Sequence, residues 1–171
     1  MNADLWRTAT LVAATLTTGL TAGLLTSFSI AVMPGLREAD DHTFLTTMQA
    51  TNRRIINPAL LVIFLGAILW TLAAMVLQLA SRGPSLPWIV TALALNIGVL
   101  AVTRAVHLPL NNRLAAAGPP DQMTQAADTR LQFEPRWTRW NTVRALLSTG
   151  ALGCLSWALV VHGGTGGVLG S

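Results

Sequence analysis

Four windows of the chain contain no charged side chain, and each is long enough to cross a lipid bilayer. A spanning helix needs about 20 mostly apolar residues. A soluble helix buries one stripe and charges the opposite face, whereas these windows are apolar all round. They cover residues 8–36, 55–81, 83–103 and 145–171. The pattern therefore predicts an all-α integral membrane protein.

Turn residues between the windows set the expected organisation. Met33-Pro34-Gly35 should end the first span, and Pro58 should kink the second. We expect a four-helix transmembrane bundle built as two helical hairpins, which forms one domain over residues 1–162. The predicted spans are residues 5–32, 58–79, 88–106 and 142–161, and a flexible Gly-rich tail is expected at 163–171.

Composition and charge agree with one compact membrane domain. The chain has 171 residues, of which 52% are hydrophobic and 11% are charged, so there is no room for a separate soluble domain. All basic side chains are arginines, and they flank the spans. This placement favours anionic membrane lipid as a partner and gives no pattern for binding nucleic acid.

The arginines also predict an orientation. The two long loops, residues 33–57 and 107–141, hold nearly all of them once Arg104 and Arg144 beside the loops are included. Arginine-rich loops stay in the cytoplasm. We therefore expect both long loops in the cytoplasm and both termini outside, in a plasma membrane of bacterial type.

Polar residues should gather at one mouth of the bundle, because both long loops lie on the same membrane face. The opposite mouth carries little polar chemistry. Ligand sites commonly lie between the helices of a bundle. The candidate residues at the loop-rich mouth are Gln49, Asn52, Arg53, Asn57, His107, Asn111, Asn112, Trp137, Trp140, Asn141 and Arg144.

Trp137, Asn141 and Arg144 share one helix face, with Trp140 beside them. An aromatic plate, an amide and a fixed cation suit a flat aromatic ligand that bears phenol or carbonyl oxygens. An interfacial belt of tryptophans is the alternative. The belt explains the two tryptophans but does not explain Asn141.

The remaining polar residues have structural alternatives as well. His107 shares a face with Asn96, Leu100 and Thr103, and it is the best candidate for a general base. A hydrogen bond from its ring to a loop carbonyl is the alternative. Ligand contact is favoured for Asn52 and helix capping for Asn57. The pair Asn111 and Asn112 is expected to cap or turn the chain.

Other functional classes find less support. The histidines show no metal-ligand spacing, and the single Cys154 allows neither a disulfide nor a cysteine metal site, so neither a metal nor another cofactor is expected. No span contains the carboxylate on which a small drug–proton antiporter depends. The first span carries a stripe of small residues that comprises Thr15, Gly19, Gly23 and Ser27. The stripe favours packing within the bundle, and a homo-oligomer interface is the alternative.

Four motifs together resemble the anthrone-oxygenase-like family of small four-span membrane proteins. They are Val32-Met33-Pro34-Gly35-Leu36, Met48-Gln49-Ala50-Thr51-Asn52-Arg53-Arg54-Ile55-Ile56-Asn57-Pro58, Pro109-Leu110-Asn111-Asn112 and Trp137-Thr138-Arg139-Trp140-Asn141-Thr142-Val143-Arg144. The resemblance extends over essentially the whole chain. At His107 the chain departs from the family pattern, which has a small polar or amide residue there.

The resemblance implies a chemistry, because some fungal members are implicated in oxidising anthrones to anthraquinones without a recognised cofactor. On this basis Asn52, Arg53 and Asn141 would donate hydrogen bonds to an oxyanion, Trp137 and Trp140 would form walls, and His107 would act as the base. The alternative is a non-catalytic membrane protein that binds a small hydrophobic molecule or lipid, or an accessory subunit. An enzyme should point Asn52, Asn141 and an arginine inward, whereas a scaffold should turn its arginines toward lipid headgroups.

Overall fold

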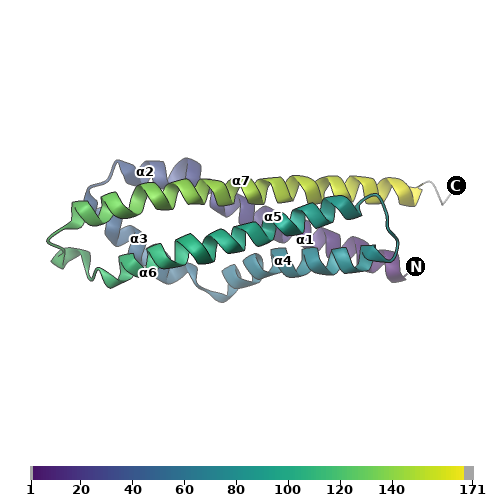
Figure 1. Ribbon diagram of the computed structural model, residues 1–171, viewed down its shortest axis with the longest axis horizontal. Coiled ribbons are helices and arrows are strands. Elements are labelled where there is room, and N and C mark those ends of the chain that lie inside the picture. Colours follow the sequence, from purple (N-terminus) through teal and green to yellow (C-terminus); the bar gives the residue numbers. More distant parts are fainter. Residues whose placement is uncertain (1, 168–171) are drawn as a thin grey trace.

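The computed structural model describes residues 2–167 as a long bundle of helices, and these residues contain no strand (Figure 1). Two of the elements, η1 and η2, are π-helices, and η3 is a short 3-10 helix. In chain order the elements are α1 (Asn2–Ser27), η1 (Phe28–Val32), α2 (Met33–Arg37), α3 (Asp41–Ile55), α4 (Pro58–Leu79), α5 (Leu86–Val102), η2 (Thr103–His107), α6 (Leu108–Ala116), η3 (Pro120–Gln122) and α7 (Ala126–Gly167).

Four continuous helices are long and apolar enough to cross a bilayer, and they confirm the predicted all-α membrane bundle. Many of their leucines and valines are exposed on the outer faces, where lipid would cover them. The tail expected from residue 163 is helical as far as Gly167, and its remainder lies outside the described residues. The four helices are Ala3–Arg37, Pro58–Leu79, Leu86–Ala116 and Ala126–Gly164.

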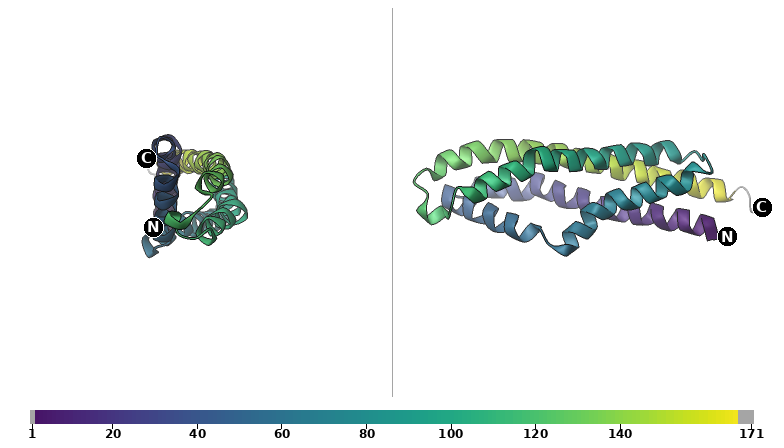
Figure 2. Two further views of the ribbon diagram at one scale, coloured as in Figure 1. Left: turned by 90° about the vertical axis from the view of Figure 1, so that its left-hand side faces the viewer. Right: turned by 60° about the horizontal axis from the view of Figure 1, so that its bottom comes forward.

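Seen end-on, the four long helices stand at the corners of a square (Figure 2). α1 packs against α4 and α7, and α5 packs against α7 and α4. A tight turn that contains Arg82 at φ 46° joins α4 to α5 near the termini. Both long connections lie at the other end of the bundle, as the even number of crossings requires (Figure 1).

Pro34, which was expected to end the first span, and Pro109, which lies just beyond the predicted end of the third span, are both inside continuous helices. Pro34 follows η1 and Pro109 follows η2, and each is the second residue after the end of the π-helix. A proline has no N–H to donate to the preceding turn. The π-helix shifts the hydrogen bonding there, so that Met33 N donates to Phe28 O and Leu108 N donates to Thr103 O. The first and third helices therefore continue past the prolines.

The expectation that Pro58 would kink a continuous helix is wrong. The chain breaks after Ile55, and α4 begins at Pro58 with Asn57 as its N-cap (Figure 2). The Asn57 side chain accepts a hydrogen bond from Leu60 N at 3.0 Å, while the ring of Pro58 suits the first helical position. Asn57 thus has the capping role and lies exposed, away from the bundle interior.

α3 begins with another cap. The Asp40 carboxylate accepts hydrogen bonds from Thr43 Oγ1 at 2.7 Å and from Thr43 N at 2.9 Å. These bonds favour the charged form and hold the pKa of Asp40 below its usual value. The cap sets the point at which α3 turns back over the open end of the bundle, where it packs against α6 and α7.

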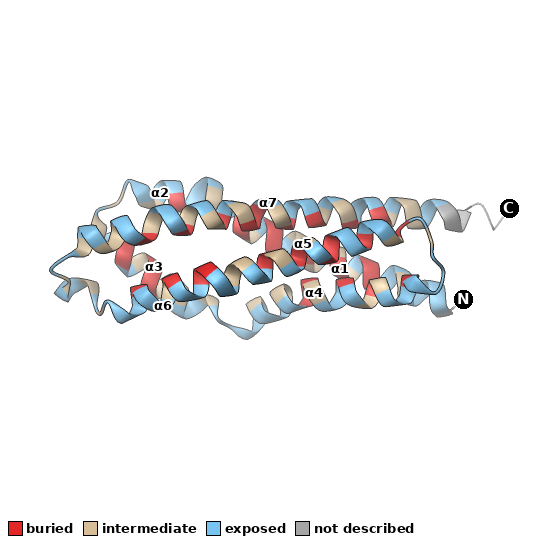
Figure 3. Ribbon diagram, in the orientation of Figure 1, coloured by how far each residue is buried: buried red, intermediate tan, exposed pale blue. Residues whose placement is uncertain are grey.

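Buried residues line the inward faces of all four long helices (Figure 3). Near the termini the core is built largely from alanines, which let the helices approach closely. At the loop end the core is built from large side chains instead, contributed by α2, α3, η2, α6 and α7. This second core comprises Met33, Phe44, Leu45, Met48, Val106, Leu110, Leu114, Phe133 and Trp137.

One polar group lies in the middle of the bundle. Asn96 on α5 is 3% exposed, and its Nδ2 donates to Thr18 Oγ1 at 3.2 Å, to Ala67 O at 3.3 Å and to Thr71 Oγ1 at 3.4 Å. Asn96 therefore faces the interior as expected. Leu100, which was expected on the same face, is 38% exposed and lies toward lipid.

Candidate functional site

One face of α7 carries four buried side chains at helical spacing, namely Trp137, Asn141, Arg144 and Ser148. Asn141 and Ser148 are fully buried, and the two larger side chains are nearly so. Three of the four are polar. A polar stripe on a helix that spans a bilayer is costly and therefore indicates a function.

Arg144 is the central charge of this stripe. Its Nη1 donates to Thr103 Oγ1 at 3.1 Å and its Nη2 donates to Asn141 Oδ1 at 2.8 Å, while its buried Nε has no partner among the described residues. Within the described residues no carboxylate forms an ion pair with Arg144. Arg130 on the same helix, by contrast, pairs with both Asp41 and Glu134.

An arginine whose hydrogen-bond partners are all neutral keeps an uncompensated positive charge. Taking a cation out of water costs several kcal/mol unless an opposite charge or full hydrogen bonding compensates it. Arg144 is 7% exposed and retains a free N–H at Nε. It can therefore accept an anionic oxygen as a ligand, which would supply the missing charge.

Asn141 fixes the position of this arginine. The side chain is fully buried, and its Nδ2 donates to Leu25 O at 2.9 Å and to Ser29 Oγ at 2.8 Å. Its Oδ1 accepts the bond from Arg144. Because all these groups are engaged within the protein, Asn141 acts as a positioning residue, in contrast with the direct donor role that the sequence predicted for it.

Replacing Asn141 by leucine should therefore destabilise the bundle. The change leaves the Arg144 Nη2 group without its acceptor, and an orphaned buried polar group costs about 1–3 kcal/mol. We expect a lower midpoint in thermal unfolding of the purified protein in lipid nanodiscs. Asn112→Leu, at an exposed position on α6, should leave the midpoint unchanged. Equal midpoints for the two variants would contradict this role.

His107 lies at the end of η2 and is 2% exposed. Its ring meets Trp137 edge to face, with centroids 5.3 Å apart and planes at 77°. The main chains of Val102 and Trp137 lie nearby, but neither ring nitrogen forms a hydrogen bond with the described residues. A buried imidazole with two open nitrogens is equipped to take or give a proton.

His107 and Arg144 both lie near the ring of Trp137. The Arg144 Cζ lies 6.0 Å from the ring centre of Trp137. Thr103, which holds Arg144, lies one turn before His107. A cation and a candidate base therefore approach the same tryptophan.

Further buried polar atoms in this half of the molecule lack partners. Asn52 on α3 has a buried Nδ2 with no partner among residues 2–167, and the same is true of Thr138 Oγ1 and Ser148 Oγ on α7. Each such group costs free energy unless a ligand or water satisfies it. Asn52 lies one turn after Met48, which is part of the loop-end core. Its amide thus remains available as a hydrogen-bond donor.

Several other predicted site residues have structural roles. Gln49 is buried and donates to Leu114 O and Gly118 O, both at 2.9 Å, so it ties α3 to the end of α6. Asn111 accepts a hydrogen bond from Trp137 Nε1 at 3.1 Å and orients that ring. Trp140 is half-buried at the edge of the loop-end core. Gln49 and Asn111 thus use their amides within the protein, and Trp140 packs against the core.

Arg53 and Asn112 are exposed. They do not join the buried cluster, which consists of His107, Trp137, Asn141 and Arg144. The inward arginine is Arg144. Sequence reasoning did not identify Ser29 or Ser148. Ser148 could have been found, because it lies one turn beyond Arg144 on the same face. Ser29 had no sequence signal, since its position depends on the π-helix.

A groove of about 180 Å³ between α6 and α7 borders this region. Phe133 lines the groove, and its ring lies 6.4 Å from that of Trp137. Leu110, one turn beyond His107, lines the opposite wall. The groove therefore lies next to the aromatic side chains that surround Trp137. Its lining residues are Leu110, Arg113, Leu114, Ala117, Thr129, Gln132 and Phe133.

Comparison with known protein families identifies a match. The family model described as "Anthrone oxygenase" matches residues 44–154, which is more than half of the chain and includes most of α3, His107 and Arg144. Neither the curated proteins nor the solved structures contain a match to this chain.

Proposed function

The chain belongs to the anthrone oxygenase family, and from that premise we propose that it oxidises a lipophilic polycyclic phenol or anthrone to a quinone with dioxygen and without a bound cofactor. The reaction takes place between His107 and Arg144. The substrate class follows from the family and from the flat aromatic walls of the site, which Trp137 and its neighbours provide.

The observation that carries the proposal is the buried Arg144 without a carboxylate partner among the described residues. An anthrone that loses a proton becomes an aromatic oxyanion. That oxygen, placed against Arg144 Nε, would complete the hydrogen bonding and balance the charge. Preorganised donors of this kind act where charge develops and usually give the largest catalytic contribution.

His107 supplies the proton transfer. With both ring nitrogens open, the neutral imidazole removes a proton from the methylene carbon of the anthrone. The electron pair of the broken C–H bond moves into the ring system and onto the oxygen near Arg144. The Asn52 amide can donate a further hydrogen bond to a phenol or carbonyl oxygen.

The oxidation balances with dioxygen as the oxidant. The anion passes one electron to dioxygen, and the two radicals combine at the former methylene carbon to form a peroxide. The protonated His107 returns its proton to this peroxide. The second proton then leaves the same carbon, the O–O bond breaks and the outer oxygen departs as water. The electron pair of the C–H bond forms the C=O bond of the quinone. One anthrone and one dioxygen thus give one anthraquinone and one water.

The alternative function, a non-catalytic protein that binds lipid or a hydrophobic molecule, accounts for the arginines at the surface. Arg53, Arg54 and Arg139 are exposed and suited to lipid headgroups. It does not account for Arg144, whose burial would be a cost without a use. The enzyme hypothesis gives Arg144 a use and is compatible with lipid contacts of the exposed arginines.

The test uses purified protein in nanodiscs and a hydroxylated anthrone such as 1,8-dihydroxyanthrone. Dioxygen uptake and quinone absorbance should rise together, in a one-to-one ratio, faster than with empty nanodiscs. Folded protein that gives no acceleration over empty nanodiscs would remove this substrate class. A change in tryptophan fluorescence on adding the anthrone, without turnover, would favour the binding protein instead.

A further inference from the structure

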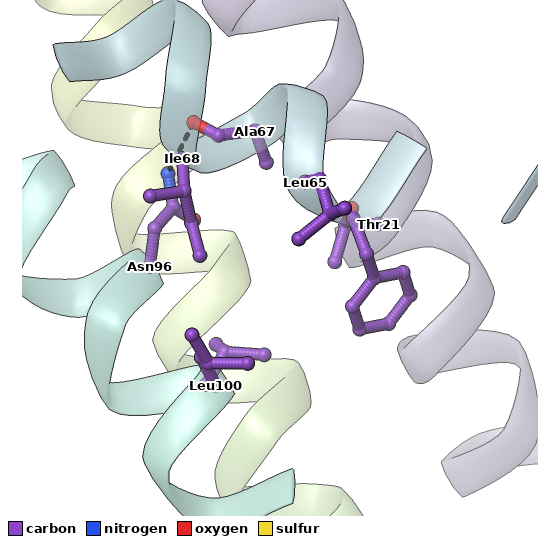
Figure 4. A pocket seen from close by; sticks show the side chains of 8 residues that line it. Thr21, Leu65, Ala67, Ile68, Asn96 and Leu100 are labelled. Atoms are coloured by element: carbon purple, nitrogen blue, oxygen red, sulfur yellow. Dashed lines mark hydrogen bonds between the residues drawn. The ribbon is translucent and has the colours of Figure 1, made fainter. Parts of the chain in front are cut away.

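A small cavity lies in the middle of the membrane-spanning part, between α1, α4 and α5 (Figure 4). Its volume is about 30 Å³, which is enough for one very small molecule. The side chains around it are mostly apolar. The lining residues are Thr21, Phe64, Leu65, Ala67, Ile68, Asn96, Val99 and Leu100.

The hydrogen-bond donors at the cavity wall are already engaged, and the single open group is the Asn96 Oδ1 acceptor, which receives no hydrogen bond from residues 2–167. Thr21 Oγ1 donates to Thr17 O at 3.0 Å, and the Asn96 amide donates to Thr18, Ala67 and Thr71. A buried water needs two to four polar partners of its own. The cavity therefore suits a small apolar molecule better than it suits water.

The cavity faces the lipid between α4 and α5. Leu65 and Leu100 both line it, and they are 48% and 38% exposed on the outer surface of the bundle. The cavity wall therefore includes side chains that reach the hydrocarbon layer. Dioxygen is apolar and dissolves better in hydrocarbon than in water, so the lipid is its natural source here.

The cavity also adjoins the reaction site. Val99 lines it and packs in one cluster with Leu25 and Ala145. Leu25 O accepts the hydrogen bond from Asn141, and Ala145 follows Arg144 directly in the chain. Val99 thus connects the cavity wall to the helix segments that carry Asn141 and Arg144.

We propose that this cavity binds dioxygen from the lipid and delivers it to the substrate anion beside Arg144. The inference rests on the proposed function, because it assigns the source of the oxidant for that reaction. It separates the two routes: the aromatic substrate approaches from the loop end, and the gas approaches from the membrane interior.

The first experiment fills the cavity. Leu100→Trp should raise the KM for dioxygen about tenfold, a factor equal to about 1.4 kcal/mol, while the KM for the anthrone stays the same. Ile97→Trp is the matched control, because Ile97 is 50% exposed on the same helix and does not line the cavity. An unchanged KM for dioxygen in folded Leu100→Trp protein would overturn the proposal.

A second pair of variants, on α4, keeps the test decisive if Leu100→Trp does not fold. Leu65→Trp fills the cavity from the other side, and Leu69→Trp, at a 60% exposed position outside the lining, is its control. Thermal unfolding in nanodiscs identifies the variants that are folded. The same rise in the KM for dioxygen is expected for Leu65→Trp alone.

Xenon provides a readout that does not depend on activity. It should bind to the wild-type protein and to Ile97→Trp, as detected by xenon NMR, and binding should be lost in Leu100→Trp. Absence of xenon binding to the wild type would overturn the cavity assignment even if anthrone is oxidised. Xenon binding without any anthrone oxidation would leave the cavity intact and remove the proposed reaction, and with it the role in delivery.

Discussion

Arg144→Gln should slow anthrone oxidation about 10²–10³-fold, the usual effect of removing one preorganised oxyanion donor. The bundle should stay folded. Arg144 is a buried cation with no carboxylate partner in the described part of the chain, so losing its charge also removes a desolvation cost. The glutamine amide can still donate to Asn141 Oδ1. A large loss of rate with no loss of thermal stability is the combination that indicates a functional charge.

The matched control is Arg139→Gln, on the same helix but exposed. It removes the same charge from the molecule without touching the buried cluster, so its rate should equal that of the wild type. Initial rates of quinone formation and unfolding midpoints in nanodiscs measure both properties. If Arg144→Gln keeps the wild-type rate, the oxyanion role assigned to Arg144 is wrong.

The second large effect is expected at His107. His107→Leu removes the general base and should reduce the rate about 10²–10⁴-fold near neutral pH. Stability should be maintained, because leucine removes two buried ring nitrogens that have no hydrogen-bond partner among the described residues. The difference from the wild type should narrow at alkaline pH, where the anthrone ionises in solution without help from the protein.

The pH profile separates a base from a packing residue. A histidine that only fills space would give a loss that is the same at every pH. His42→Gln serves as the control, because His42 is half exposed and its ring contacts Asp121, far from the buried cluster. Full activity of His107→Leu at neutral pH would exclude His107 as the base and would return attention to the substrate's own ionisation.

The sequence was sufficient for the fold because the physical signal is simple. Uncharged windows of spanning length have few solutions other than transmembrane helices, and the even number of crossings fixes which loops share a face. The proline positions were harder to predict. Pro34 and Pro109 are compatible with a continuous helix only because a π-helix precedes each of them, and no residue type marks such a segment.

The site was predicted only in part, because helical spacing shows which residues share a face but not which face is buried. Helical spacing placed Trp137, Asn141 and Arg144 on one face, and the structure buries all three. The same reasoning could not separate Asn52 from Arg53 on α3. Successive residues on a helix point about a quarter-turn apart, and the packing of Met48 turns Asn52 inward and Arg53 outward. The sequence also could not show which side-chain amides form hydrogen bonds within the protein, because those partners are set by tertiary contacts.

The hydroxyls of Ser29 and Thr103, which hydrogen-bond to Asn141 and Arg144, have a consequence for membrane insertion of the protein. Ser29 belongs to the first spanning helix and Thr103 to the third, whereas the guanidinium arrives with the last. An arginine within a lone apolar helix is costly in lipid. The final segment should therefore remain at the translocation machinery, or at the bilayer edge, until the earlier three are present to receive it, which makes its insertion the committing step of biogenesis.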